Sequence, residues 1–225
     1  MSERQEFAVR AALLLPVWAA WWLAAVVQLA PAAEVAIIAG GLLLTYPLVW
    51  LGRISLPRGA SLQRVNWMTT GVHLGLGFTL GVPLVRAVAT HAAWPGPGLA
   101  FPAGIGLALT LLSGTAFFVC VANLALKGLG APFYLALSEK LAVEWLYAWT
   151  RNPMALAGIA FLFSLGLWYQ SALFAAWALL LFSPALLFFI RVYEQWELEL
   201  RFGEPYLEYK RRTPFLIPRR PPSPG

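Results

Sequence analysis

Two short polar segments carry the residues of this 225-residue sequence that are best suited to chemistry. The first, Trp-Thr-Arg-Asn-Pro-Met at 149–154, places a cation and an amide directly before an apolar run. Proline costs no hydrogen bond in the first turn of a helix, so Pro153 predicts a helix start whose free N–H groups point toward Arg151 and Asn152. A helix N-terminus beside a guanidinium is suited to bind a carboxylate or another anion.

The second segment, 193–219, follows another apolar run and begins with an acidic patch. The residues of this patch are Glu194, Gln195, Glu197 and Glu199. Acidic charge next to a membrane span works against the usual excess of basic residues on the inner side, so the patch predicts a function. Spacing of four residues places Glu194, Leu198, Phe202 and Tyr206 on one helical face. Gly203 and Pro205 then interrupt the helix, and Tyr209 follows on the same side as Tyr206.

We expect these two segments to form one site. The apolar runs 154–168 and 171–191 are separated by very few residues, which predicts a tight antiparallel hairpin that brings Glu194 to the same membrane face as Arg151. A cation, an anion and aromatic walls would meet there, at the edge of the bilayer. Such a pocket suits a zwitterionic cofactor and a lipid-soluble substrate. The alternative is that Arg151 only marks the inner membrane face.

The elements that position these residues are membrane helices. The chain is 60% hydrophobic and 12% charged, whereas soluble domains average about 25% charged residues. Apolar runs lie at 11–30, 32–52, 65–88, 99–122, 154–168 and 171–191. This pattern predicts an all-α integral membrane protein with about six transmembrane helices and a C-terminal interfacial helical segment. The first run is long for the core of a signal peptide, so we expect it to be a retained helix.

The distribution of basic residues predicts the orientation. If the N-terminus is inside, Arg86 is the only one of the 16 Lys and Arg residues in an outer loop. We therefore expect both termini in the cytoplasm of a multi-pass protein, such as one of the bacterial inner membrane, with the site facing the cytoplasm. The expected divisions are a four-helix membrane region at 1–138, a catalytic region at 139–219 and a disordered tail at 220–225. Oligomeric state is not predictable from these patterns.

Several classes of ligand are disfavoured by the residues present. No Cys, His or Asp cluster has metal-ligand spacing, so no metal site is expected. The basic residues lie in loops and are not gathered with stacking aromatics, which argues against nucleic acid. Four glycines at 71, 75, 77 and 81 have the spacing that favours close helix packing. The expected partners are membrane lipids and a lipophilic small-molecule or lipid substrate.

Three motifs in the last third of the chain resemble one known superfamily. The block from Leu141, LAVEWLYAWTRNPM, resembles the segment before the fifth span of the isoprenylcysteine carboxyl methyltransferase and phospholipid methyltransferase superfamily. That segment usually contains Gly-Pro-Tyr followed by Arg-His-Pro or Arg-Asn-Pro. The block EQWELELRFGEPYLEY resembles its Glu-Glu, Leu, Phe-Gly, Tyr, Tyr motif, and TPFLIPR its closing Pro-x-x-Ile-Pro. The resemblance extends from Leu141 to Arg219.

The resemblance implies an integral membrane methyltransferase that uses S-adenosylmethionine on the cytoplasmic side, with its substrate entering laterally from the membrane. Carried over to this sequence, the first half of the cofactor site would contain Tyr147, Arg151, Asn152, Pro153 and Met154. The second half would contain Glu194, Gln195, Leu198, Phe202, Gly203, Tyr206 and Tyr209. Arg151 and Glu194 are the residues expected to carry catalysis, on an isoprenylcysteine-like carboxylate or a phospholipid-like amine.

The chain departs from the family pattern at three positions. Trp145-Leu146 replaces Gly-Pro, Ala155 replaces an aromatic residue, and Gln195 replaces the second acid of the Glu-Glu pair. The missing charge leaves open a non-catalytic membrane scaffold that retains the fold. Membrane sterol and enone reductases, which use a nicotinamide cofactor, are distantly similar at their C-terminal region but generally longer. A transporter is least favoured, because the sequence has no pair of broken helices with charges at the membrane midplane.

Overall fold

A computed structural model describes residues 3–94, 96–126 and 141–220 of the chain. These residues form helices joined by short loops, and their only β-type pairing is an isolated bridge between Gly98 and Ser171. The all-α prediction is therefore confirmed for the described residues. The expected boundary at 138–139 and most of the expected tail at 220–225 lie outside them.

The N-terminal part of the chain forms three helical rods. The first is α1 (Glu3–Val26). The second consists of α2 (Pro31–Val35), the π-helical segment η1 (Ala36–Gly40) and α3 (Gly41–Ile54). The third consists of α4 (Leu62–Leu76), the π-helical segment η2 (Gly77–Gly81), α5 (Val82–Thr90) and a 3₁₀ turn, η3 (His91–Ala93).

The C-terminal part contains a helical hairpin and a short final helix. Two helices precede the hairpin, α6 (Ala103–Leu126) and α7 (Leu146–Trp149). The hairpin consists of α8 (Pro153–Trp168) and a second helical rod. That rod consists of α9 (Ala172–Trp177), η5 (Ala178–Phe182), α10 (Ser183–Phe189), η6 (Ile190–Glu194) and α11 (Gln195–Phe202), with η5 and η6 π-helical. Gly203 has a φ of 59° and ends α11 before α12 (Glu204–Arg212), as the Gly203–Pro205 interruption predicted.

Five helical rods among the described residues are long and apolar enough to cross a membrane. They are Gln5–Val26, Pro31–Ile54, Leu62–Ala93, Ala103–Ala125 and Ala172–Phe202. The remaining predicted span, α8, is apolar but has only 16 residues, shorter than a typical membrane-spanning helix. The membrane-protein architecture is thus supported, whereas six crossings and a cytoplasmic location of both termini stay predictions.

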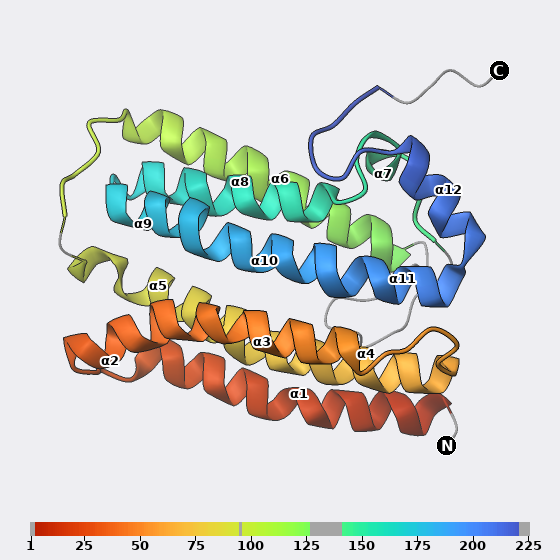
Figure 1. Ribbon diagram of the computed structural model, residues 1–225. Coiled ribbons are helices and arrows are strands. Elements are labelled where there is room, and N and C mark those ends of the chain that lie inside the picture. Colours follow the sequence, from red (N-terminus) through yellow and green to blue (C-terminus); the bar gives the residue numbers. More distant parts are fainter. Residues whose placement is uncertain (1–2, 95, 127–140, 221–225) are drawn as a thin grey trace.

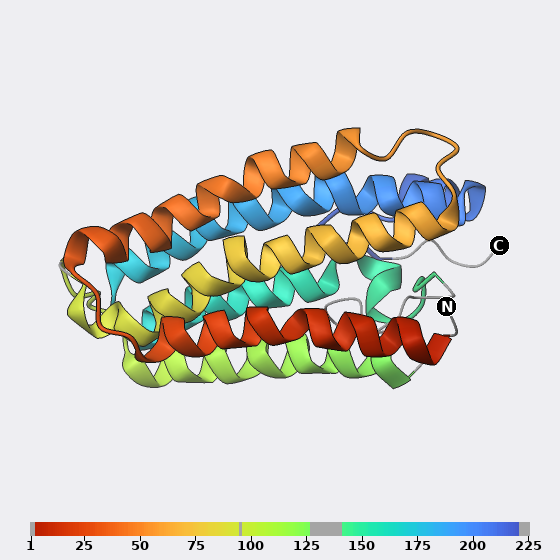
Figure 2. The same ribbon diagram turned by 90° about the horizontal axis from the view of Figure 1, so that it is seen from below.

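The rod α9–α11 lies between two groups of helices (Figure 1). On one side it packs against the N-terminal rods through α3, and on the other side it packs against α8, which in turn lies along α6 (Figure 2). The start of α1 and the C-terminal helix α12 lie at the same end of the bundle (Figure 1). The hairpin predicted between α8 and α9 is present, and it returns α11 to the end of the bundle at which α8 begins (Figure 1).

Glycines on the third rod allow close packing, as predicted for three of the four positions. A Cβ atom at Gly75, Gly77 or Gly81 would lie within 3.0 Å of a side chain from a neighbouring helix. Gly71 instead faces open space, with nothing within 4 Å of its ideal Cβ. Small residues therefore set the distance between the N-terminal rods, as is common in membrane bundles.

Arg86 differs from its expected place in an outer loop. It lies inside α5, and its side chain is only 3% exposed. Its Nε and Nη2 donate to the two carboxylate oxygens of Glu34. The positive charge that the topology pattern assigned to an outer loop is therefore neutralised by Glu34. The helix that carries it, α5, lies at the end of the bundle opposite α12 (Figure 1).

Replacing Gly106 by alanine is expected to loosen the packing of α6 on α8. The new Cβ would lie 2.7 Å from the backbone nitrogen of Trp168 and 2.8 Å from its Cα, and backbone atoms cannot move aside cheaply. We expect a loss of about 1–3 kcal/mol in the free energy of unfolding, measured by thermal unfolding in detergent. Gly104→Ala, with nothing within 4 Å of its Cβ, is the matched control. Equal behaviour of the two variants would contradict this packing.

Candidate cofactor site

The closing segment of the chain is bound to the segment that precedes α8. The backbone N–H of Arg151 donates to the carbonyl of Pro214 (2.9 Å), and the Asn152 side chain donates to the carbonyl of Phe215 (2.7 Å). The Thr150 hydroxyl donates to the carbonyls of both Phe215 and Leu216. Two of the three sequence motifs, more than 60 residues apart, therefore meet in space.

Arg151 lies at this junction with most of its hydrogen-bonding capacity unused. Its Nε and Nη1 are buried, and neither has a hydrogen-bond partner among the described residues. The guanidinium carbon is 5.7 Å from the centre of the Phe215 ring, which gives a cation–π contact but no counter-charge. Burying a charged donor without a partner is costly. The arrangement is therefore that of a site for an anion.

Three tyrosines form the wall of the site beside Arg151. Tyr147, Tyr206 and Tyr209 are at most 9% exposed, and the Tyr209 hydroxyl donates to the carbonyl of Tyr147 at 2.7 Å. Burial raises the pKa of Tyr206 to about 12, and the nearby Arg151 guanidinium opposes this rise. All three phenols therefore stay neutral at physiological pH and present hydrophobic rings with polar edges.

Glu194 approaches the same tyrosines from the end of η6. Its side chain is half-buried, and it makes no hydrogen bond or ion pair within the described part of the chain. Burial raises the pKa of Tyr147, and the charge of Glu194 adds to that rise. The carboxylate also acts on Tyr206, which places it within electrostatic reach of both tyrosines. The structure thus brings both Glu194 and Arg151 within electrostatic reach of Tyr206.

The other predicted site residues have more mixed surroundings. Asn152 precedes α8 but uses its amide nitrogen on Phe215, so it also holds the closing segment in place. Pro153 is buried at the first position of α8, and Met154 follows it half-buried. Leu198 and Phe202 are half-buried, Gln195 is buried, and Gly203 provides the turn into α12.

The predicted acidic patch is not a single patch. Glu197 is fully buried and paired with Arg201, one helical turn away. Glu199 pairs with Lys210 of α12 at 2.6 Å. Because consecutive residues of a helix point in different directions, the patch is divided among several faces. Among the described residues, Glu194 is the one carboxylate of this group without an ion-pair partner.

Sequence reasoning missed two residues of the site. Phe215 was part of the quoted closing motif, and its ring lies near Arg151. Arg191 is exposed, and its guanidinium carbon lies 5.8 Å from the centre of the same ring. Arg191 precedes Glu194 by one helical turn, and this spacing could have indicated that Arg191 lies near the site.

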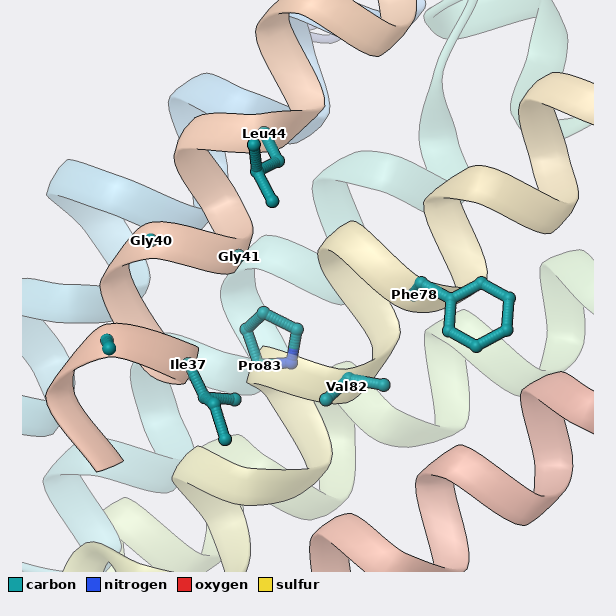
Figure 3. A pocket seen from close by; sticks show the side chains of 8 residues that line it. Ile37, Gly40, Gly41, Leu44, Phe78, Val82 and Pro83 are labelled. Atoms are coloured by element: carbon teal, nitrogen blue, oxygen red, sulfur yellow. The ribbon is translucent and has the colours of Figure 1, made fainter. Parts of the chain in front are cut away.

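Two cavities of the described residues lie away from this site. The first, of about 450 Å³, is apolar and lies between the second and third rods, where Ile37, Leu44, Phe78 and Pro83 line it (Figure 3). The second, of about 230 Å³, lies near His91, Trp94 and Tyr169. Neither is lined by a predicted site residue. We assign the site from its charges, because an apolar cavity offers nothing to bind an ionic group. The described residues also contain no group of three or more potential metal ligands.

Comparison with known proteins agrees with the motifs. The family model described as phospholipid methyltransferase matches residues 102–205, from just before α6 to the first turn of α12. No significant match was found among curated proteins or among solved structures. The matched region begins earlier than the resemblance from Leu141, so α6 is part of it. Residues 102–205 are therefore similar to the phospholipid methyltransferase family, which stands with the isoprenylcysteine carboxyl methyltransferases among the integral membrane methyltransferases.

Proposed function

We propose that this protein is a membrane-embedded methyltransferase that uses S-adenosylmethionine and acts on a lipophilic acceptor at the cytoplasmic interface. The family of residues 102–205 indicates methyl transfer at a membrane. The observation that carries the finer proposal is the buried Arg151 guanidinium, whose Nε and Nη1 lack partners among the described residues. It lies near a carboxylate, Glu194, that also lacks an ion pair there.

The residues present fit this cofactor. The methionine part of S-adenosylmethionine is a zwitterion, with a carboxylate that suits Arg151 and an amino group that suits Glu194. Bidentate pairing makes an arginine particularly well suited to a carboxylate. Glu194 is equally suited to accept hydrogen bonds from ribose hydroxyls. The rings of Tyr147, Tyr206 and Tyr209 would form the wall against which the cofactor lies and would exclude water from it.

The chain's contribution to the reaction would be alignment. When bound, the cofactor supplies an electrophilic methyl group carried on a sulfonium. Little acid catalysis is needed for such a displacement, so most of the acceleration must come from holding both reactants in line in a dry site. Arg151 and Glu194 would fix one reactant, and the bilayer edge would deliver the other. Acceptors that fit this location are an isoprenylcysteine-like carboxylate and a phospholipid-like amine.

The test is titration calorimetry of S-adenosylmethionine into the detergent-purified protein. We expect the wild type to bind, and we expect Glu194→Ala to weaken binding about tenfold to a hundredfold, because a charge-assisted hydrogen bond contributes about 1.5–3 kcal/mol. Glu208→Ala, which removes an exposed carboxylate of α12, is the matched control and should bind normally. A well-folded wild type that does not bind, with or without added lipid, would contradict the proposal and favour a non-catalytic use of the fold.

A further inference from the structure

The helix that carries Glu194 has a second polar face, turned toward the N-terminal rods. Tyr193, Trp196 and Glu197 recur at helical spacing on this face, whereas Glu194 and Leu198 lie on the face toward the tyrosine cluster. Tyr193 and Glu197 have no exposed surface. We call the contacts that Tyr193 and Trp196 make with the N-terminal rods the seam. The seam joins the first half of the chain to the proposed cofactor site.

Tyr193 is held between α3 and α4. Its hydroxyl is 3.1 Å from the Thr69 hydroxyl of α4, and both residues are fully buried. Its ring lies against Gly52 of α3 so closely that a Cβ there would be 3.0 Å from the ring. The same Cβ would be 2.5 Å from Val72, a stiff β-branched side chain. The absence of a side chain at Gly52 therefore leaves the space that Tyr193 occupies.

Trp196 fixes the next turn of the helix. Its indole N–H donates to the carbonyl of Leu56, in the loop between α3 and α4, at 2.9 Å. The Arg53 guanidinium carbon lies 3.7 Å from the centre of the Trp196 ring, which is a close cation–π contact. Two polar anchors one turn apart thus restrain the rotation of this helix about its axis.

Rotation matters at this point because the helix is π-helical at Ile190–Glu194. A π turn closes its hydrogen bond over one residue more than an α turn does. Conversion to an α turn would rotate the following residues about the helix axis by the angle between consecutive residues of an α-helix, about 100°. The side chains of Glu194 and Leu198 would then point in a different direction relative to the helical turns that precede the π segment. Tyr193 lies inside the π segment and Trp196 just after it, where they oppose this rotation.

We propose that Tyr193 and Trp196 are positioning residues, which direct the Glu194 carboxylate toward the tyrosine cluster and thereby set the affinity for the cofactor. This inference rests on the proposed function and gives the N-terminal helices a part in it. They hold the site helix in register, although they contribute no residue to the predicted cofactor site.

The test is a double-mutant cycle on the affinity for S-adenosylmethionine. Tyr193→Phe removes one hydroxyl and is expected to weaken binding about threefold to tenfold, in line with the loss of a net hydrogen bond. If Tyr193 acts through Glu194, the same change in a Glu194→Gln background should leave the affinity unaltered. Its effect on the unfolding temperature should persist in both backgrounds. A purely structural role would not produce this difference.

A second pair of variants tests the seam from the other side. Gly52→Ala should displace Tyr193 and weaken binding at least as much as Tyr193→Phe does. Gly71→Ala makes the same chemical change on α4 with nothing within 4 Å of the Cβ, so it should bind normally. Full additivity of Tyr193→Phe with Glu194→Gln, or unchanged affinity in Tyr193→Phe, would overturn the inference while leaving the proposed function standing. A wild type that does not bind S-adenosylmethionine would overturn both.

Discussion

Replacing Arg151 by alanine is expected to abolish S-adenosylmethionine binding and turnover while the protein still inserts and folds. The guanidinium has two buried nitrogens without hydrogen-bond partners among the described residues, so it can bind an anionic ligand through them. Removing it eliminates a charge without an ion-pair partner, and this gain offsets the loss of its hydrogen bond to Tyr206 and of its cation–π contact with Phe215. The unfolding temperature without cofactor should therefore be equal to that of the wild type or higher, and calorimetry should detect no binding.

Two further variants test whether the loss of binding comes from the Arg151 guanidinium itself. Arg151→Lys keeps the charge but loses the planar fork, so we expect binding to be weakened rather than abolished. Arg220→Ala removes an exposed cation, makes the same change in net charge and should bind normally. Normal turnover in Arg151→Ala would rule out this residue as the carboxylate ligand. A lowered unfolding temperature with intact binding would make Arg151 a structural residue.

Replacing Arg86 by methionine is expected to cause the largest loss of stability. The Arg86 Nε donates to Glu34 at 2.6 Å, and its Nη1 donates to the carbonyls of Ala24 and Val27. This side chain therefore joins the end of α1, the start of the second rod and α5. The variant leaves the Glu34 carboxylate and both carbonyls without this donor. Breaking one side of a buried pair costs about 3–5 kcal/mol, which corresponds to a fall in unfolding temperature on the order of ten degrees.

The partner variant distinguishes a lost ion pair from a lost side chain. Arg86→Met combined with Glu34→Leu should recover part of the stability, because no uncompensated carboxylate then remains. α5, which contains Arg86, lies at the end of the bundle opposite α12 (Figure 1), so cofactor affinity measured well below the unfolding temperature should not change. Thermal unfolding in detergent that is no different from the wild type would contradict the role assigned to Arg86.

The departure at Trp145 has a structural consequence that the sequence alone did not reveal. Trp145 has a φ of 57° and a ψ of −121°, a conformation that glycine adopts easily and that strains other residues. The family motif places its Gly-Pro at positions 145–146, so the glycine there matches the backbone geometry of the turn. In this chain a tryptophan occupies it, 55% exposed, and Tyr147 nevertheless reaches its buried place in the wall of the site.

The local elements of this protein follow from its amino-acid sequence. Apolar length and the breaks at Pro153, Gly203 and Pro205 predicted the helices and the hairpin, because helix formation depends on neighbouring residues and on the bilayer. The motifs predicted that Arg151 and Glu194 lie near each other, because a short hairpin leaves the chain little choice. The family match of residues 102–205 agrees with the resemblance that these motifs carry.

Which polar groups find partners depends on the tertiary structure. Asn152 and Phe215, Thr69 and Tyr193, and Glu34 and Arg86 are each more than 50 residues apart, and helical periodicity does not specify such pairs. Packing gave Glu197, Glu199 and Arg86 ion-pair partners, and it left Arg151 and Glu194 without one among the described residues. That difference separates structural charges from the candidate binding charges, because the cost of burying an ion depends on neighbours that are distant in sequence.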